Sequence, residues 1–139
     1  MWRKYKIMER VKKLLESKGI RPTHQRLKIL KYLEDNKQHP TVDIIYGVMK
    51  KDIPTISKTT VYNTLNSLIE NGVVLPIIIT GKETRFDSIV TPHHHFYCEK
   101  CGKILDLKVE CEHFKKGNIQ GHKIKEMHGY YKGICKNCL

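Results

Sequence analysis

The sequence predicts an α+β protein with two domains, at residues 1–88 and 89–139. Three observations lead to this prediction. Apolar residues recur at helical spacing up to residue 71, two runs rich in β-branched residues follow up to residue 87, and two Cys-x2-Cys pairs lie between residues 98 and 138. We therefore expect a helical N-terminal domain that ends in a β-hairpin and a small C-terminal α/β domain.

The bulk composition is that of an ordinary globular protein, with 40% hydrophobic and 29% charged residues among 139. The basic N-terminus is not followed by the apolar core of a secretory signal. The longest strongly apolar run, residues 73–79, is far shorter than the ~20 residues that a membrane-spanning helix needs. We expect a cytoplasmic protein without a membrane partner, whose five cysteines are reduced.

The net charge of +12 indicates an acidic partner, and its distribution is uneven. Residues 1–37 contain 12 basic and 4 acidic residues, whereas residues 38–91 contain 5 of each and sum to zero. Residues 92–139 contain 9 basic and 5 acidic residues. A merely soluble basic surface is the alternative, so a nucleic-acid partner also needs an argument from shape.

Four helices are expected in the N-terminal domain. Gly19 ends the first, Pro22 opens the second, and Thr41 and Ser57 are natural N-caps of the third and fourth. Pro54 and the Asn71-Gly72 pair end the last two. Apolar side chains at helical spacing give each helix a buried face: Ile7, Val11, Leu14 and Leu15; Leu27, Leu30 and Leu33; Val42, Ile45, Tyr46 and Met49; Val61, Leu65 and Leu68.

The fourth helix carries a second, polar stripe at positions 59, 62, 63 and 66, formed by Thr, Tyr, Asn and Asn. Such groups can bind base edges and phosphates, although a plain solvated face is the alternative. After Gly72 the pattern changes to two β-rich runs that flank a turn at residues 80–82. Helices followed by a hairpin form a winged helix, a helix-turn-helix variant, so DNA binding is the leading hypothesis.

Two cysteine pairs mark the C-terminal domain. Cys98-x2-Cys101 and Cys135-x2-Cys138 can supply four thiolates to a tetrahedral Zn²⁺. The long gap between them can hold a strand at 103–107, a short helix at 110–116 and a strand at 130–134. A redox-active Cys-x-x-C is the alternative, but it needs one pair only. Cys111 belongs to neither pair, and we expect a plain thiol there.

The histidines at 93–95 raise the question of a second metal. His93 and His95 are two apart in a predicted strand and share a face, whereas His94 faces the other way. Because the cysteines already fill the zinc site, this pair needs carboxylates, and Asp87 and Asp106 are the nearest candidates. A mixed nitrogen and oxygen set suits Fe²⁺, Mn²⁺ or Zn²⁺. Ordinary surface histidines and solvated carboxylates are the alternative.

Six stretches occur in the order of one known family and cover nearly the whole chain: Pro22–Arg26 (PTHQR), His39–Tyr46 (HPTVDIIY), Ser57–Leu65 (SKTTVYNTL), Arg85–Asp87 (RFD), His93–Lys103 (HHHFYCEKCGK) and Cys135–Cys138. With them the chain resembles the ferric uptake regulator family of bacterial metal-dependent repressors. The resemblance implies a homodimer, a C-terminal dimerisation domain, structural Zn²⁺ on the four paired cysteines and regulatory Fe²⁺ or Mn²⁺, with Zn²⁺ possible. The implied regulatory ligands are His39, Asp87, His93, His95 and Asp106.

Within that family the chain looks closest to the peroxide-responsive repressors. Asp at 87 and 106 is similar to that branch, whereas the iron-responsive branch more often has Glu at both places and Asp in place of His94. In the peroxide branch, bound iron reacts with peroxide and a histidine ligand is oxidised, and His39 and His93 match the susceptible positions. His24, Pro92 and His94 depart from the family pattern. His113, His122 and His128 could contribute to an additional metal site, but we treat them as ordinary histidines.

The expected function is therefore a metal-dependent repressor that binds a palindromic operator in double-stranded DNA. The candidates for DNA contact are Arg21 and Arg26 on phosphates, and Lys58, Thr59, Thr60, Tyr62 and Asn63 on bases. Alternatives are an iron- or zinc-uptake regulator that senses metal only, and a zinc-ribbon module that does not bind DNA. A metal hydrolase is a weaker hypothesis because no His-Glu-x-x-His element or general base is evident. We expect neither an enzyme nor a small-molecule substrate.

Overall fold

The fold is that of a computed structural model, which describes residues 2–79, 83–91, 93–109, 116–125 and 129–139. The chain divides into two compact units, Met1–Val90 and Thr91–Leu139. Each unit has its own secondary structure and is described by itself. None of the described helices is long and apolar enough to cross a membrane.

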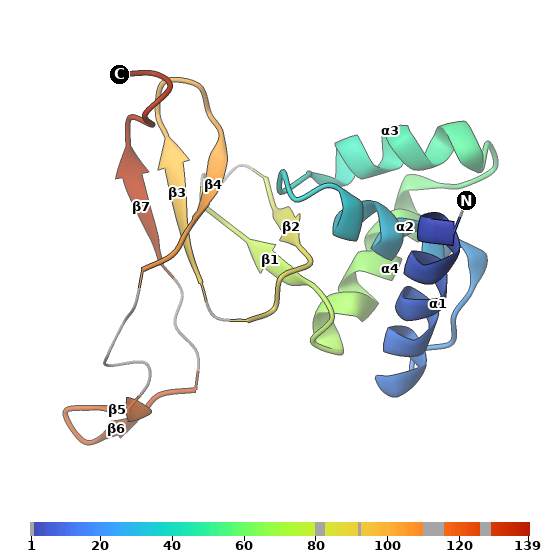
Figure 1. The fold of residues 1–139 in the computed structure, drawn as a ribbon, viewed down its shortest axis with the longest axis horizontal. Coiled ribbons are helices and arrows are strands. Elements are labelled where there is room, and N and C mark those ends of the chain that lie inside the picture. The colour runs from blue at the N-terminus through green and yellow to red at the C-terminus, as the bar shows by residue number, and fades with distance from the viewer. Residues whose placement is uncertain (1, 80–82, 92, 110–115, 126–128) are drawn as a thin grey trace. The chain divides into compact units, whose positions relative to one another are not determined.

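The N-terminal unit consists of four helices followed by a two-stranded hairpin, in the order that the sequence predicts (Figure 1). The four helices surround the apolar core, and the hairpin follows them and contributes Phe86 to that core. The elements are α1 (Trp2–Ser17), α2 (His24–Asp35), α3 (Val42–Asp52), α4 (Lys58–Glu70), β1 (Leu75–Ile77) and β2 (Arg85–Asp87).

Hydroxyl side chains set three of the helix starts. Thr41 and Ser57 accept hydrogen bonds from the backbone N–H three residues later, at 3.4 and 3.0 Å, so both predicted N-caps are confirmed. The predicted start of α2 at Pro22 is wrong, since the helix begins at His24 and Thr23 caps it. Proline has no side-chain acceptor, whereas the Thr23 hydroxyl can bind the backbone N–H of Arg26.

The core of the N-terminal unit combines buried members of the predicted apolar stripes with residues outside them, such as Ile20, Ile56 and Phe86. The side chains of Leu15, Ile45 and Leu65 are completely buried. Fully burying one such side chain contributes about 1.5–3 kcal/mol, so this cluster is the main source of the unit's stability. The remaining members are Val11, Ile29, Leu30, Leu33, Met49, Val61, Leu68, Val73 and Val74.

The hairpin is joined to the start of α3. Strands β1 and β2 pair in antiparallel fashion, with Pro76 opposite Phe86. The backbone N–H of Phe86 also donates to the Pro40 carbonyl at 3.1 Å, and Thr41 forms a bridge with Arg85. Strand β2 therefore pairs with β1 on one side and with the residues just before α3 on the other. The predicted turn at 80–82 lies outside the described residues.

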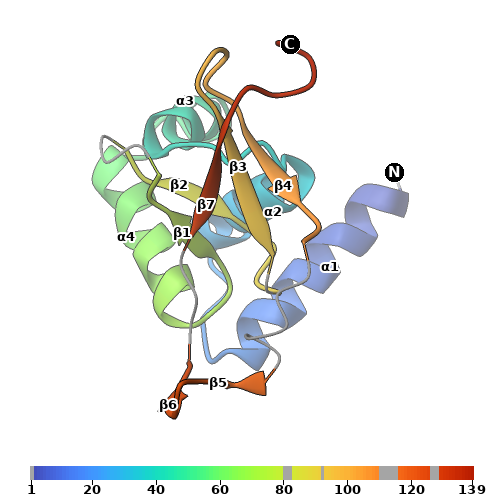
Figure 2. The same cartoon turned by 90° about the vertical axis from the view of Figure 1, so that its left-hand side faces the viewer.

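The C-terminal unit contains a three-stranded sheet in which β3 lies between β4 and β7 (Figures 1 and 2). β3 is antiparallel to β4 and parallel to β7. The predicted strands near 103–107 and 130–134 are confirmed, but the small β5–β6 hairpin was not predicted. Residues 110–115 of the predicted helix lie outside the described part. The elements are β3 (His94–Cys98), β4 (Ile104–Leu107), β5 (Asn118–Ile119), β6 (His122–Lys123) and β7 (Tyr130–Gly133).

Candidate metal centres and nucleic-acid interface

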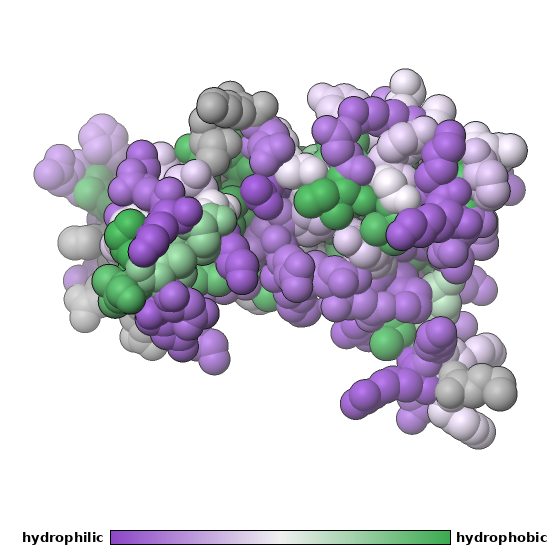
Figure 3. All heavy atoms as spheres, turned by 90° about the horizontal axis from the view of Figure 1, so that it is seen from above, coloured by the Kyte–Doolittle hydropathy of each residue, from purple (hydrophilic) through white to green (hydrophobic). Residues whose placement is uncertain are grey.

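The helix α4 separates an apolar face from a polar one. Leu65 and Leu68 are fully buried, whereas Thr59, Tyr62 and Asn63 are exposed. The predicted polar stripe therefore faces solvent and is available to a partner. Most of the visible surface of the N-terminal unit is likewise hydrophilic (Figure 3).

A hollow of about 610 Å³ lies beside this polar stripe, between α3, α4 and the hairpin. Thr59, Tyr62 and Asn66 line it from α4, and Ile78 lines it from the hairpin. At its edge, Lys58 forms an ion pair with Asp43 at the start of α3. The exposed groups of α4 thus lie on a concave surface rather than a flat one.

Of the other candidates for DNA contact, Thr60 and Arg26 are engaged in hydrogen bonds within the unit, whereas Arg21 is exposed. The Thr60 hydroxyl lies 2.8 Å from the Ser57 hydroxyl and belongs to the N-cap of α4. The Arg26 guanidinium donates to the Arg21 carbonyl at 3.0 Å, so it supports the loop before α2. Arg21 itself is exposed. Of these three, Arg21 is the best placed to meet a phosphate.

The four paired cysteines of the C-terminal unit form one cluster, in which the Sγ atoms lie within 4.8 Å of one another. Cys98 ends β3, Cys101 lies in the turn before β4, and the other pair follows β7. That turn requires the left-handed backbone of Gly102, with φ of 72°. The described cysteines form no disulfide. The spacing and geometry suit tetrahedral coordination of one ion.

The charges of these thiols favour a bound dication. The backbone N–H groups of Cys101 and Cys135 donate to the Cys98 sulfur and lower the pKa of that thiol to about 6. A hydrogen bond with the Cys135 thiol, together with burial, raises the pKa of Cys138 to about 12. Four thiols this close cannot all lose their protons without a cation between them. The cluster therefore fits Zn²⁺, which binds thiolates.

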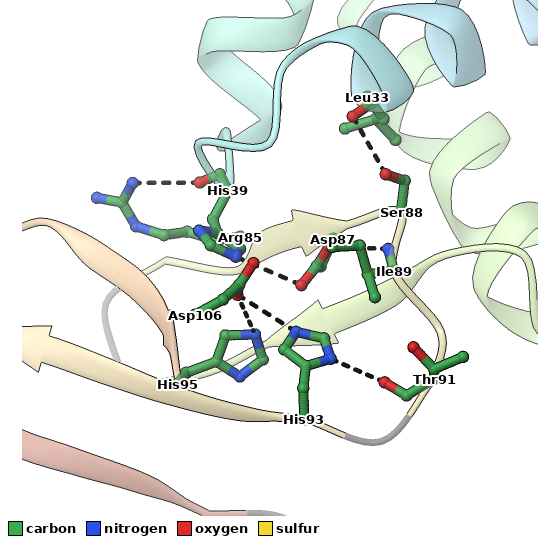
Figure 4. Close-up of polar contacts among 10 residues, drawn as sticks. All are labelled: Leu33, His39, Arg85, Asp87, Ser88, Ile89, Thr91, His93, His95 and Asp106. Atoms are coloured by element: carbon green, nitrogen blue, oxygen red, sulfur yellow. Dashed lines mark hydrogen bonds and ion pairs between the residues drawn. The ribbon is translucent and has the colours of Figure 1, made fainter. Parts of the chain in front are cut away.

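The N-terminal unit carries a buried histidine and carboxylate pair. The Nε2 of His39 lies 3.3 Å from Oδ2 of Asp87, and both side chains are only 2% exposed (Figure 4). The other oxygen of Asp87, Oδ1, accepts the backbone N–H of Ile89 at 2.9 Å. His39 precedes α3 and Asp87 ends β2, so two elements of the fold bring this nitrogen and oxygen together. We call this pair the first half-site.

The C-terminal unit carries a second set, which we call the second half-site. Nε2 of His93 and Nε2 of His95 lie 3.3 and 3.4 Å from the same oxygen of Asp106 (Figure 4). His95 and Asp106 are cross-strand partners in β3 and β4. Nδ1 of His93 lies 2.8 Å from the Thr91 carbonyl, which can only accept, so Nδ1 carries the proton. Nε2 of His93 is then the nitrogen that can bind a metal.

His94 takes the opposite direction, as its position in the strand predicts. Its ring makes an edge contact with Tyr131 of β7, at 5.8 Å between centroids. His122 is exposed on β6, and His24 is exposed at the start of α2. The remaining residues that the sequence singled out, Pro92, Cys111, His113 and His128, lie outside the described residues.

The ferric uptake regulator family model matches residues 17–132 of the sequence. The chain belongs to the ferric uptake regulator family. The peroxide operon regulator of Bacillus subtilis is 35% identical over 128 residues, which are 89% of this chain and 88% of that protein. A family resemblance inferred from six short motifs is thereby confirmed.

Solved structures of this family have the same fold. The peroxide stress regulator of Campylobacter jejuni is 32% identical, with a TM-score of 0.70 over 94% of this chain and 98% of that one. The ferric uptake regulator of Helicobacter pylori is 21% identical, with a TM-score of 0.74 over 96% of this chain and 92% of that one. The predicted α+β class, with a winged helix and a small C-terminal domain, is confirmed.

The residue patterns alone missed two contributors to the first half-site. His39 entered only through the family resemblance, because one histidine before a predicted helix has no partner nearby in the sequence. Arg85 appeared only within the RFD stretch and was given no role, yet its Nη1 donates to the His39 carbonyl at 3.2 Å. The only signal was that Arg85 and Asp87 alternate along one strand.

Proposed function

We propose that this protein is a metal-dependent, DNA-binding transcriptional repressor that responds to peroxide. The observation that carries the proposal is a set of histidine and carboxylate groups in contact within each unit, buried in the first and partly exposed in the second. His39 and Asp87 form one set, and His93, His95 and Asp106 form the other. Together they would offer three imidazole nitrogens and two carboxylates, which suits Fe²⁺ or Mn²⁺.

The switch would work through the connection between the two half-sites. A metal ion held by both sets would restrain the winged-helix unit relative to the C-terminal unit. Because such an ion binds only the state in which both half-sites meet, its binding shifts the population toward that state. In a homodimer, that state would set the distance between the two α4 helices. This distance would match the spacing of the two symmetric halves of a palindromic operator.

The response to peroxide would depend on the histidine ligands. Peroxide would be the two-electron oxidant, bound Fe²⁺ would activate it, and its second oxygen atom would leave as water. The imidazole carbon of His39 or His93 would gain one oxygen atom, and the altered ring would bind the metal less well. The winged-helix unit would then lose its restraint, and operator affinity would fall.

The cysteine cluster would hold Zn²⁺ in a structural role. Among the described residues of the C-terminal unit, the only buried apolar side chains are Cys98, Ile104 and Cys135. So small a core contributes little stability, and a structural metal or a partner subunit offsets this. Several apolar side chains of the unit are exposed and could form the dimer contact: Leu105, Val109, Tyr130, Tyr131 and Ile134.

DNA would be bound by the N-terminal unit in the cytoplasm. Thr59, Tyr62 and Asn63 of α4 would face bases in the major groove, with Lys58 beside them. Arg21 and Arg26 would lie near phosphates. The relatives are named as regulators, and we propose the same for this chain rather than a metal hydrolase.

Mass spectrometry of the Fe²⁺-loaded protein after dilute peroxide tests this proposal. We expect a gain of one oxygen atom on His39 or His93, with the Mn²⁺-loaded protein as an unreactive control. Operator binding of the same samples should fall only where oxygen is gained. An unmodified protein that still needs Fe²⁺ or Mn²⁺ for DNA binding would instead be a plain metal sensor. DNA binding that is unaffected by metal would contradict the whole proposal.

A further inference from the structure

Strand β2 holds the residue His39 at two points. Nη1 of Arg85 donates to the His39 carbonyl at 3.2 Å, and two residues later Asp87 lies 3.3 Å from the His39 ring (Figure 4). Residues two apart on a strand point to the same face. One face of β2 therefore determines both the backbone position and the ring position of His39.

The backbone of His39 needs such support. Its φ is 54°, which lies in the left-handed region that residues other than glycine rarely adopt. The residue is only 2% exposed, and Pro40 follows it. The bond from Arg85 and the bond from the Phe86 N–H to the Pro40 carbonyl, at 3.1 Å, hold this segment in place. Without the Arg85 bond, the His39 backbone would lose one of these two restraints.

Arg85 is poorly explained by stability alone. One terminal nitrogen of its guanidinium pairs with Glu83 at 3.2 Å, and the other binds the His39 carbonyl. Its Nε is buried and has no hydrogen-bond partner among the described residues. A buried donor without an acceptor costs stability, so a residue kept in this position points to another role.

We propose that Arg85 is a positioning residue for the regulatory metal. By holding the His39 carbonyl, Arg85 keeps the backbone left-handed and directs the imidazole toward Asp87. Arg85 does not touch the metal, and it acts through His39. The inference rests on the proposed role of His39 as a ligand and adds the residue that sets the affinity of the first half-site.

The test is the Mn²⁺ affinity of Arg85→Lys, measured by calorimetry on the full chain. Lysine keeps the charge but loses the planar fork that reaches the His39 carbonyl and Glu83 together. We expect the dissociation constant for Mn²⁺ to rise about 10- to 100-fold, as for other groups that orient a ligand. Operator affinity at saturating Mn²⁺ should match that of the wild type. A purely structural role would not weaken Mn²⁺ binding while leaving operator affinity at saturating Mn²⁺ unchanged.

The matched control is Glu83→Gln, which removes the outer ion pair and leaves the bond to His39. It should bind Mn²⁺ like the wild type. Thermal unfolding of the metal-free proteins reports whether each variant is folded, and Arg85→Gln is the second variant if the lysine variant is not. Its neutral amide also lacks the fork, and the same loss of Mn²⁺ affinity is expected.

Three results would overturn the role of Arg85: unchanged Mn²⁺ affinity in the folded Arg85 variant, an equal loss in Glu83→Gln, or weaker operator binding at saturating Mn²⁺ with Mn²⁺ affinity unchanged. The last result would make Arg85 a direct DNA contact. If wild-type protein binds the operator equally with and without Mn²⁺, the proposed function fails, while the affinities of the variants still decide the role of Arg85.

Discussion

At the scale of single residues, three consecutive histidines fall into two kinds, with His94 and His95 alternating in β3 and His93 just before the strand. His93 and His95 reach the same oxygen of Asp106, whereas His94 contacts Tyr131. A shift of one residue in the register of β3 against β4 would exchange these faces. The pairing of His95 with Asp106 therefore determines which rings can serve as ligands.

His93→Ala should lower operator affinity at least about 10-fold at a Mn²⁺ concentration that saturates the wild type, because one ligand of the regulatory metal is lost. His94→Ala is the matched control, since its ring lies on the other face. Fluorescence anisotropy with labelled operator measures both variants. Wild-type affinity in His93→Ala would refute the assignment of this site.

At the scale of secondary structure, α4 has one face for folding and one that we propose for recognition. Its N-cap, Ser57, and its buried side chains belong to the first role. Of its exposed side chains, Lys58 forms an ion pair with Asp43 of α3, and Thr59, Tyr62 and Asn63 face solvent. The two roles can therefore be separated by mutations on neighbouring turns of the same helix.

Leu65→Ala should destabilise the N-terminal unit by about 2–5 kcal/mol, because it leaves a cavity in a fully buried site. Asn63→Ala should change the free energy of unfolding by less than about 0.5 kcal/mol but weaken operator binding by about 1–3 kcal/mol. Urea unfolding and DNA titration measure the two effects. An Asn63→Ala protein with wild-type operator affinity would exclude Asn63 from base recognition.

At the scale of the whole molecule, the described part of the C-terminal unit combines a small apolar core with a cluster of four cysteines, so we expect its stability to depend on the metal that they bind. Cys135→Ser should lose the bound Zn²⁺, and with it the homodimer, since one of four ligands is replaced by a poorer one. Lys136→Ala is the control, because this exposed neighbour lies outside the cluster. Metal analysis and analytical ultracentrifugation provide the readouts. A folded, zinc-free dimer of Cys135→Ser would refute the structural role.

Local patterns made most of this fold predictable. The spacing of Val61, Leu65 and Leu68 identified α4, and the hydroxyl of Ser57 identified its start. The start of α2 was misplaced because Pro22 and Thr23 are both typical near a helix N-terminus, and only the bond to Arg26 decides between them. The hairpin β5–β6 has two residues in each strand, too few for an alternating pattern.

The candidate metal sites were predictable to different degrees for a physical reason. The cysteine pairs are visible in the sequence because the two cysteines of each pair are only three positions apart, and the structure brings all four together. The first half-site joins residues far apart in the chain, since Arg85 and His39 are 46 positions apart. Contacts of that kind follow from the packing of β2 against the loop before α3, which no local pattern encodes. The family resemblance supplied His39, but it did not supply the role of Arg85.

The backbone N–H of Ile89 donates to Asp87 just where the chain leaves the winged helix. Ser88 also donates to the Leu33 carbonyl, at 3.2 Å, so the chain leaves the winged helix from a fixed point (Figure 4). Only six steps separate Asp87 from His93, and they span at most roughly 22 Å when extended. So short a tether would give each half-site a high effective concentration at the other. If both half-sites bind one metal ion, as proposed, the metal affinity would depend on the length of a segment that contributes none of the proposed ligands.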